Sequence, residues 1–167
     1  REHLDDIVRS SIRMKDLMEE VLLLGRVEAG KMECRIAPVN LPQLIRRAIN
    51  EISTATAERC PITPELGSLN GVCRLDESVV HIILTNLLSN AVKYSPPGRP
   101  IQCFARRDGD RVQIDIRDEG IGIPVADQAN LFKTFHRATN VGDISGTGLG
   151  LTIVKRCVEL HRGTISF

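Results

Sequence analysis

Three polar side chains share one stripe of an otherwise apolar segment near the middle of the chain. Between His81 and Tyr94, apolar residues occur nearly all round the expected helix. At about 100° per residue, Asn86, Asn90 and Lys93 nevertheless fall within roughly 60° of arc. Polar groups on a buried helix need partners, from backbone, water or a ligand. A helix edge packed beneath a loop would satisfy the two amides, whereas the lysine favours an anionic ligand. His81 lies on nearly the opposite side, so we do not expect it to share that ligand.

A second candidate site is the Asp-x-Gly-x-Gly motif formed by Asp118, Gly120 and Gly122. It follows a predicted strand directly. Glycines let the backbone come close to a flat ligand, and a carboxylate at that point can accept a hydrogen bond from it. The same spacing also occurs in ordinary turns, so the motif alone leaves a turn and a binding site both open.

A third candidate site is the glycine-rich segment that opens the last predicted helix, with Gly146, Gly148 and Gly150. Glycines at a helix N-terminus expose backbone N–H groups and the positive end of the helix dipole, which suits phosphate. The spacing is neither that of a Walker loop, since no Lys-Ser or Lys-Thr follows, nor the Rossmann spacing. A phosphate site and a structural turn both remain open for this segment.

Composition excludes several classes of function. The chain has 167 residues, enough for one domain of about 150 residues and a short appendage. It is 42% hydrophobic and 26% charged with a net charge of +1, so it can build a sizeable core but carries no basic field for nucleic acid. No segment approaches the roughly 18–20 apolar residues of a membrane span, so we expect no direct membrane contact.

The cysteines and histidines argue against a metal site. The cysteines are Cys34, Cys60, Cys73, Cys103 and Cys157. They form no C-x-x-C, which excludes zinc and thioredoxin-type sites, and their odd number and wide gaps favour reduced thiols in the cytoplasm. No two histidines stand four residues apart on one helix, so we expect no histidine-built metal site. No signal peptide is visible. We expect Arg1 to mark a cut within a longer chain rather than a natural start.

The first 31 residues show the period of a helix. Their apolar seam is formed by Leu4, Ile7, Ser11, Met14, Met18 and Val21. A lone helix cannot bury such a seam, so we expect a partner helix that was cut away or that another chain supplies.

Glycines and prolines, which end helices and strands, and the period of the apolar residues predict the remaining elements. We predict helices over 41–58, 77–94, 125–132 and 149–160, and strands over 62–66, 71–75, 101–107, 111–117 and 164–167. We predict a connector over residues 30–42 and a hairpin turn at Asp108-Gly109-Asp110. The predicted fold class is α+β, a two-layer α/β sandwich with one mixed sheet covered on one face by helices, plus an N-terminal helical arm.

The order of the motifs is more specific than any one of them. Asn-x-x-x-Asn-x-x-Lys-Tyr on a helix, Asp-x-Gly-x-Gly after a strand, Phe132-x-x-Phe135-x-Arg137 and Gly-x-Gly-x-Gly on a helix together resemble the ATP-binding domain of sensor histidine kinases. Its superfamily includes gyrase-type and MutL-type ATPases and heat-shock chaperones. Residues 22–31 resemble the end of the second helix of the kinases' dimerisation hairpin. The resemblance implies two parts: this helix and linker over 1–34, without the first helix, and over 35–167 a catalytic domain without its last strands.

The resemblance implies ATP and Mg²⁺ as ligands and assigns residues to them. Asp118 would accept the exocyclic amine of adenine, and Asn90 would hold Mg²⁺ through its side-chain oxygen, a hard ligand for a hard cation. The other expected nucleotide contacts are Gly120, Gly122 and Ile123 at the base, Lys93 at the phosphates, Tyr94 packed on the nucleotide, and Gly146, Thr147, Gly148, Leu149 and Gly150 around the phosphate tail.

Catalysis is expected to depend on Asn86, Lys93 and Arg137. Lys93 and Mg²⁺ would neutralise phosphate charge, and Arg137 would reach the transferred phosphate from a lid over 138–145. The ATPase relatives have a glutamate that activates water where this chain has Asn86, whose amide cannot take up a proton. We therefore expect ATP hydrolysis near background, with a brace for Asn90 as the alternative role of Asn86.

The resemblance implies a protein-histidine kinase. It would pass the γ-phosphate of ATP to a histidine, for onward transfer to an aspartate of a response-regulator receiver domain in two-component signalling. We expect a cytoplasmic chain whose parent dimerises through the helical hairpin and can be membrane-anchored. No H-E-x-x-x-P-like run occurs around His3, His81, His136 or His161, so we expect no phosphoacceptor in this chain. The alternatives are an ATPase or ATP-driven clamp of the same superfamily, and a non-catalytic nucleotide-binding docking module.

Overall fold

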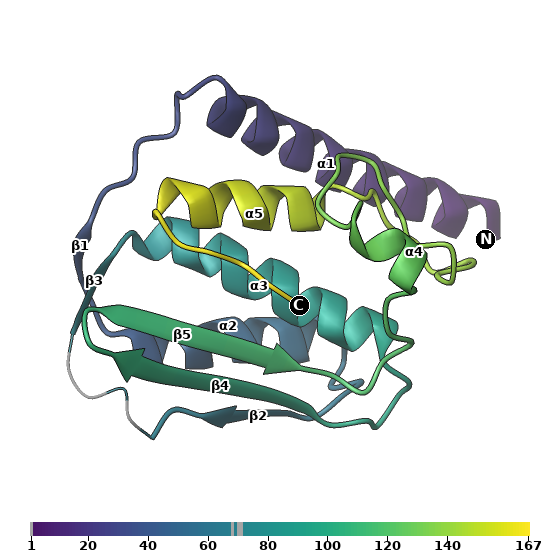
Figure 1. The fold of residues 1–167 in the computed structure, drawn as a ribbon. Helices are drawn as coiled ribbons and strands as arrows, with labels where there is room; N and C mark the ends of the chain where they lie inside the picture. The colour runs from purple at the N-terminus through teal and green to yellow at the C-terminus, as the bar shows by residue number, and fades with distance from the viewer. Residues whose placement is uncertain (1, 68, 70–71) are drawn as a thin grey trace.

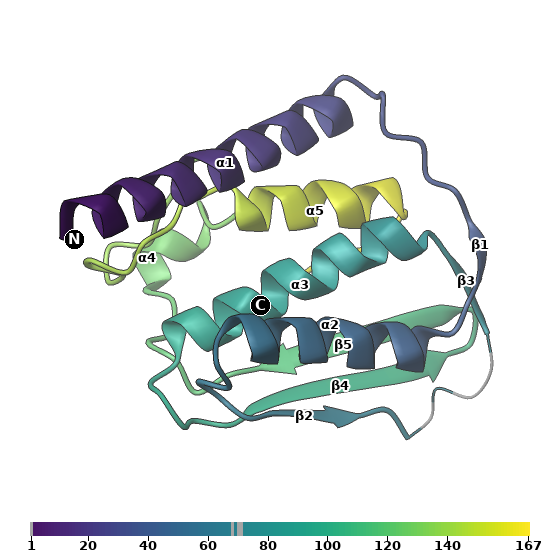
Figure 2. The same cartoon turned by 180° about the vertical axis from the view of Figure 1, so that it is seen from behind.

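The computed structural model describes residues 2–67, 69 and 72–167. Its elements, in chain order, are α1 (Glu2–Glu28), β1 (Ala37–Val39), α2 (Leu41–Ala55), β2 (Ile62–Glu65), β3 (Cys73–Leu75), α3 (Glu77–Tyr94), β4 (Ile101–Asp108), β5 (Arg111–Arg117), α4 (Val125–Gln128) and α5 (Gly150–Leu160). Helices α2 and α3 lie on one face of the strands, and α5 lies between α3 and the long α1 (Figures 1 and 2). The predicted α+β class, a layer of helices on a mixed sheet with a helical arm, is confirmed.

The described strands form two sheets where the sequence predicted one. Strand β2 pairs parallel with β4, and β4 pairs antiparallel with β5, so the three-stranded sheet is mixed. A separate antiparallel pair joins β1 to β3. Strand β1 lies in the segment expected to be only a connector. Strand β3 was predicted from residue 71, which lies outside the described residues, and is described from Cys73.

Local chemistry explains where α2 and α3 begin and end. The side chains of Asn40 and Asp76 cap the two helices, accepting hydrogen bonds from the backbone N–H of Gln43 (3.1 Å) and Val79 (3.0 Å). Helix α3 has the predicted limits. Helix α2 ends at Ala55, short of the predicted residue 58, because residues 57 and 58 adopt φ values of +49° and +54°, outside the helical region.

The buried side chains form two cores. The larger lies between the strands and helices α2 and α3, and includes Ile45, Leu88 and Ile101, all at 0% exposure. The smaller joins α1, α3 and α5 and is formed by Leu24, Val79, Leu149, Ile153 and Cys157. Helix α1 therefore docks on the domain through its last turns.

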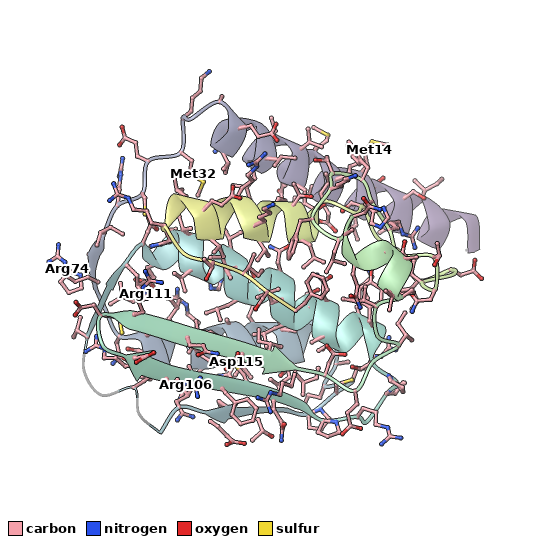
Figure 3. All side chains as sticks on the ribbon, in the orientation of Figure 1. Met14, Met32, Arg74, Arg106, Arg111 and Asp115 are labelled. Carbon is pink, nitrogen blue, oxygen red and sulfur yellow. The ribbon has the colours of Figure 1, made fainter. Side chains whose placement is uncertain are left out.

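Most of the apolar seam of α1 is exposed, as its pattern predicted. Met14, which projects from the helix in Figure 3, is 64% exposed, and the other exposed apolar side chains of α1 are Ile7, Val8, Ile12, Leu17, Met18, Val21 and Leu22. The side chains of residues 2–6, including Leu4 and His3, lie outside the described ones. Within the described residues, no helix combines the length and the apolar character that crossing a membrane requires.

Three predicted elements need correction. Helix α4 ends at Gln128 rather than 132, and the residues from there to α5 form turns and irregular loops. Helix α1 ends at Glu28 rather than 31, because Gly30 turns the chain at φ +63°. Residues 164–167 form no strand, since no described strand pairs with them.

Candidate nucleotide site

The polar stripe of α3 lies directly beneath the start of α5. A methyl group added at Gly150 would lie 2.9 Å from Oδ1 of Asn86 and 3.9 Å from Nδ2 of Asn90. A side chain at position 150 would displace the Asn86 amide, so the glycine lets the first turn of α5 lie close to the two amides. The amide of Asn86 also donates to the carbonyl of Ile82, one turn earlier (2.9 Å). Asn86 is therefore braced by its own helix.

Lys93 lies against the glycine-rich segment. A methyl group at Gly146 would lie 2.5 Å from its Nζ and 3.7 Å from the hydroxyl of Tyr94. The ammonium also lies 4.9 Å from the centroid of the Tyr94 ring, within cation–π distance. No carboxylate among the described side chains lies within 4.0 Å of it. A cation without a described counterion therefore faces a loop of small residues.

The loop after β5 packs against the end of the same helix. The Gly120 N–H donates to Asp118 Oδ1 (2.8 Å), and the Ile121 N–H donates to the carbonyl of Tyr94 (3.2 Å). A methyl group at Gly120 would lie 2.6 Å from Asp118 Oδ1 and 2.7 Å from the Tyr94 carbonyl oxygen. Gly122 has φ +66°. The Asp-x-Gly-x-Gly motif is thus a tight turn fixed to α3, and it leaves the Asp118 carboxylate exposed.

Residues 129–148 run between these two loops and include the predicted lid residues 138–145, so from here on we call the whole segment the lid. Phe135 has φ +60°, and its N–H donates to the carbonyl of Gly148 (3.1 Å). Gly148 has φ +74°, and a methyl group there would lie 2.8 Å from the His136 carbonyl oxygen. The backbone of residues 135 and 136 therefore crosses closely over that of residue 148, and only a glycine at position 148 permits this crossing.

Arg137 makes its described hydrogen bonds within the lid. Its guanidinium is exposed and donates to two carbonyls of the lid itself, those of Gly142 (3.4 Å) and Ile144. Asn140, which sequence reasoning missed, joins the lid to the other loop by donating to the carbonyls of Ile121 (3.2 Å) and Gly122 (3.1 Å). Its residue type marks it only as a turn former, so the sequence carries no signal for this contact.

The remaining predicted residues have mixed surroundings. The Leu149 side chain is fully buried in the smaller core, so only its backbone could meet a ligand, and its N–H donates to Thr147 Oγ1 (3.2 Å). The Thr147 hydroxyl donates to the carboxylate of Glu20 on α1. The carbonyl of Ile123 accepts from the Gln128 amide (3.2 Å) and lies outside the cluster.

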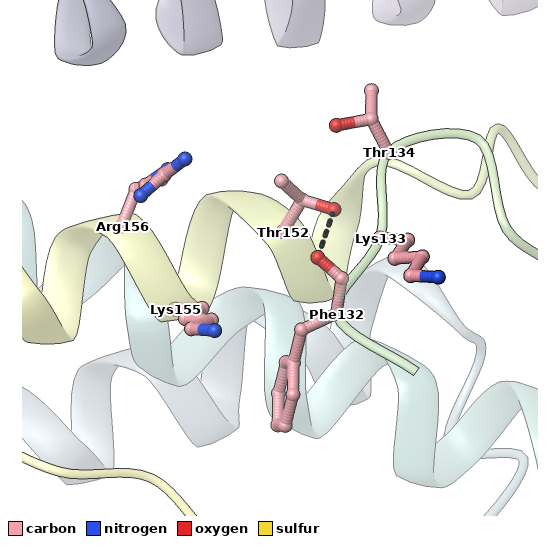
Figure 4. A pocket seen from close by; sticks show the side chains of 6 residues that line it. All are labelled: Phe132, Lys133, Thr134, Thr152, Lys155 and Arg156. Carbon is pink, nitrogen blue, oxygen red and sulfur yellow. Dashed lines mark hydrogen bonds between the residues drawn. The ribbon is translucent and has the colours of Figure 1, made fainter. Parts of the chain in front are cut away.

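Asn90, Lys93 and Asp118 line neither of two cavities that lie along α5. One, of about 260 Å³, lies between residues 132–134 and α5 and is lined by Phe132, Lys133, Thr134, Thr152, Lys155 and Arg156 (Figure 4). Thr152 Oγ1 donates there to the Phe132 carbonyl (3.1 Å). The other, of about 380 Å³, is lined by Val27, Glu28, Arg156, Glu159 and Leu160.

Two buried carboxylates are held ionised, one beside the lid and one at the start of α3, away from the site. Asp127 accepts from the backbone N–H and hydroxyl of Thr139, and these bonds hold the pKa of its carboxyl below the usual range although burial opposes ionisation. Burial likewise opposes ionisation of Asp76. The N–H groups of Arg35, Val79 and Ser78 and the neighbouring His161 nevertheless lower the pKa of its carboxyl.

The side chains present at the site limit which kind of metal ion it could bind. No group of three or more His, Cys, Asp or Glu side chains within the described residues is arranged to bind a metal ion. The amide oxygen of Asn90 is nevertheless a hard ligand, of the kind Mg²⁺ takes. The cluster therefore fits a magnesium ion that receives most of its ligands from phosphate and water. Burial raises the pKa of the Cys103 and Cys157 thiols to about 11, so neither is a thiolate ligand at neutral pH.

Comparison with known proteins shows which family the chain matches. The model of the histidine kinase-, DNA gyrase B- and HSP90-like ATPases matches residues 75–167. The circadian input-output histidine kinase CikA of Synechococcus elongatus is 35% identical over 170 residues, which cover 99% of this chain and 22% of that protein. The chain thus spans about a fifth of that kinase.

Two solved structures share the fold. Full-length ShkA in complex with AMPPNP matches with a TM-score of 0.80 and 27% identity, over 96% of this chain and 34% of that one. The histidine kinase ThkA in complex with the response regulator protein TrrA matches with a TM-score of 0.75 and 19% identity, over 98% of this chain and 45% of that one. Both matches include the helical arm as well as the sandwich.

Proposed function

We propose a function from one premise: the chain belongs to the family of histidine kinase-, DNA gyrase B- and HSP90-like ATPases, and its relatives include sensor histidine kinases. We propose that it is the part of a sensor histidine kinase that binds ATP and donates the γ-phosphate. One observation carries this proposal: two glycine-containing loops meet the same end of α3, one holding the exposed Asp118 and the other facing the ammonium of Lys93. An acceptor for an amine and a cation for phosphates are thus fixed to one helix.

The residues divide between the two ends of a nucleotide. Asp118 would accept the adenine amine beside Gly120, Gly122 and Ile123. Lys93 and the backbone of residues 146–150 would hold the phosphates, and Tyr94 would pack on the nucleotide. Asn90 would hold Mg²⁺, which when bound neutralises charge on the phosphates. Arg137 would first have to leave the lid carbonyls of Gly142 and Ile144.

The surroundings of Asn86 favour transfer over hydrolysis. Its amide donates to the backbone of its own helix and cannot accept a proton, so it does not activate water. This disfavours the alternative of an ATPase or ATP-driven clamp. We expect steady-state ATP hydrolysis near background when no acceptor is present, and rapid turnover would favour the clamp instead.

The phosphate acceptor would be a histidine outside the described part of this domain. His81 lies 3.1 Å from a Glu51 carboxylate oxygen, His136 lies 3.5 Å from that of Asp127, and His161 accepts from the backbone N–H of Asp76. Each is engaged within the domain. The exposed apolar seam of α1 fits a partner helix, so we propose that residues 1–34 belong to a dimerisation hairpin that presents the acceptor. A response-regulator receiver would then take the phosphoryl group, as the ThkA complex suggests by likeness of fold. Because ATP is the substrate, we place this chain on the cytoplasmic side.

The test is the affinity for Mg²⁺-ATP of wild-type chain and the Asp118→Ala variant, measured by calorimetry. Loss of a hydrogen bond to a charged group costs about 1.5–3 kcal/mol. The variant should therefore bind about 10- to 150-fold more weakly. Asp110→Ala, which removes an exposed carboxylate from the β4–β5 turn, is the matched control and should bind like wild type. No binding by the wild type, or equal affinity in the Asp118 variant, would refute the proposed site.

A further inference from the structure

A buried acidic residue beside the lid has no part in the site described so far. Asp127 lies on α4 and is 5% exposed. Its Oδ2 accepts from the Thr139 backbone N–H (2.8 Å) and hydroxyl (2.9 Å). Its Oδ1 lies 3.5 Å from His136 Nε2, an electrostatic contact longer than a good hydrogen bond. One carboxylate thus holds two residues of the lid.

The two residues that Asp127 holds stand on either side of Arg137. His136 precedes the arginine and Thr139 follows it by two positions. Between them, only the Arg137 guanidinium makes a described side-chain hydrogen bond, to lid carbonyls. A buried carboxylate is costly unless hydrogen bonds compensate it, and the Thr139 donors do so here. Asp127 therefore fixes the backbone after the arginine through Thr139 and contacts the side chain of the residue before it.

We propose that Asp127 is a positioning residue, which directs Arg137 toward the terminal phosphate of ATP by holding His136 and Thr139. The inference rests on the proposed function, since it needs a nucleotide at the site. An arginine with a fixed backbone loses less conformational freedom when its guanidinium meets a phosphate, so the interaction retains more of its energy. ADP lacks the terminal phosphate. Asp127 should therefore matter for ATP and hardly at all for ADP.

The test compares Mg²⁺-ATP with Mg²⁺-ADP on the whole chain, together with the melting temperature of each variant. We expect Asp127→Asn to reduce the preference for ATP over ADP by about three- to tenfold, since it weakens charge-assisted hydrogen bonds. Its affinity for ADP should stay within about twofold of wild type, because the base and the first phosphates bind elsewhere. Asp143→Asn is the matched control: Asp143 is an exposed lid residue whose carboxylate has no hydrogen bond to the described residues.

Two further variants separate positioning from folding. Thr139→Val should lower the ATP preference, and Thr139→Ser, which keeps the hydroxyl, should restore it. In an Arg137→Ala background, Asp127→Asn should cause no additional loss of preference, because the group that it positions is gone.

Each other outcome has its own meaning. Equal loss for ATP and ADP with a lower melting temperature would make Asp127 merely structural and overturn the proposal. So would an unchanged preference, or a wild-type chain that binds both nucleotides without preferring ATP. A wild type that binds neither nucleotide would instead refute the proposed function itself.

Discussion

Two buried carboxylates hold two different regions of this molecule. Asp76, 7% exposed, lies where the linker after α1, the start of α3 and the end of α5 meet. It accepts from the N–H groups of Arg35 (2.7 Å) and Val79 (3.0 Å), and its own N–H donates to His161 (3.2 Å). Asp127, 5% exposed, holds only the lid. In both, hydrogen bonds lower the pKa of the carboxyl against the opposing effect of burial.

The difference lies in what surrounds each carboxylate. Val79, whose N–H binds Asp76, is fully buried in the smaller core together with Ile153 and Cys157. Thr139, whose N–H binds Asp127, is exposed and lies in a segment without regular secondary structure. The same chemistry should therefore stabilise the whole fold at Asp76 and only a local conformation at Asp127. The site is built from both kinds of region: α3 contributes to both cores and holds the loop after β5, whereas no residue of the lid belongs to either core.

The largest expected effect is that of Asp76→Ala on global stability. The variant leaves the N–H groups of Arg35 and Val79 without their acceptor and removes the cap of α3. It should cost about 1–3 kcal/mol of unfolding free energy at neutral pH. Asp127→Ala should leave the melting temperature nearly unchanged, because the lid lies outside both cores. Denaturant unfolding of both variants measures the contrast, and equal losses would contradict the division into two regions.

The effect of Asp76 should also depend on pH in a definite direction. The pKa of its carboxyl is lower in the folded protein than in the unfolded chain, where it is about 3.9. The carboxylate therefore contributes its full stability above that value, and the contribution is lost as pH falls through the lower, folded pKa. The gap in unfolding free energy between wild type and Asp76→Ala should be constant from about pH 5 to pH 6 and close below about pH 4. Unfolding curves in this range check the sign.

The next largest effect concerns the crossing inside the lid. Gly148→Ala places a methyl group 2.8 Å from the His136 carbonyl oxygen on a backbone with φ +74°. A left-handed backbone alone costs a non-glycine residue about 1–2 kcal/mol. We therefore expect ATP affinity to fall by about 5- to 30-fold, with little change in melting temperature.

Gly142→Ala is the control for that variant. Gly142 also has a positive φ, +49°, but a methyl group there meets no atom within 4 Å. It carries the backbone strain without the collision, so its affinity loss should be clearly smaller. Equal losses in the two variants would show that strain in the lid, and not the crossing at position 148, controls nucleotide binding.

The sequence predicts the fixed region much better than the lid. Helix α3 has its predicted limits because apolar residues, a capping aspartate and two following prolines all indicate the same helix. Strand β1 could not be predicted, since three residues around Pro38 carry no alternation and depend on pairing with β3. Strand propensity alone wrongly indicated a strand over 164–167.

In the lid, residue types do not indicate which contacts form within the chain. The predicted phosphate contact Arg137 binds lid carbonyls, whereas Asn140 and Asp127, which no motif marks, hold the lid in place. These bonds join residues up to 19 positions apart through irregular backbone. Periodicity and local propensity describe neighbours on one helix or strand, so they contain no information about such pairs.

The smallest expected effect concerns the one described hydrogen bond between α1 and the glycine-rich segment, from Thr147 to Glu20. If residues 146–150 hold phosphates, the Glu20 carboxylate repels them. Glu20→Gln keeps an acceptor for Thr147 and removes the charge, so ATP affinity should rise by about 1.5- to 5-fold, in the range of partly exposed charge pairs, and the gain should shrink in high salt. Glu19→Gln, whose carboxylate is 63% exposed and pairs with Lys15 at 3.4 Å, should change nothing. A fall in affinity would mean that Glu20 supports the loop instead of opposing the ligand. A rise would mean that the charge of Glu20, on α1, opposes the phosphates across this hydrogen bond.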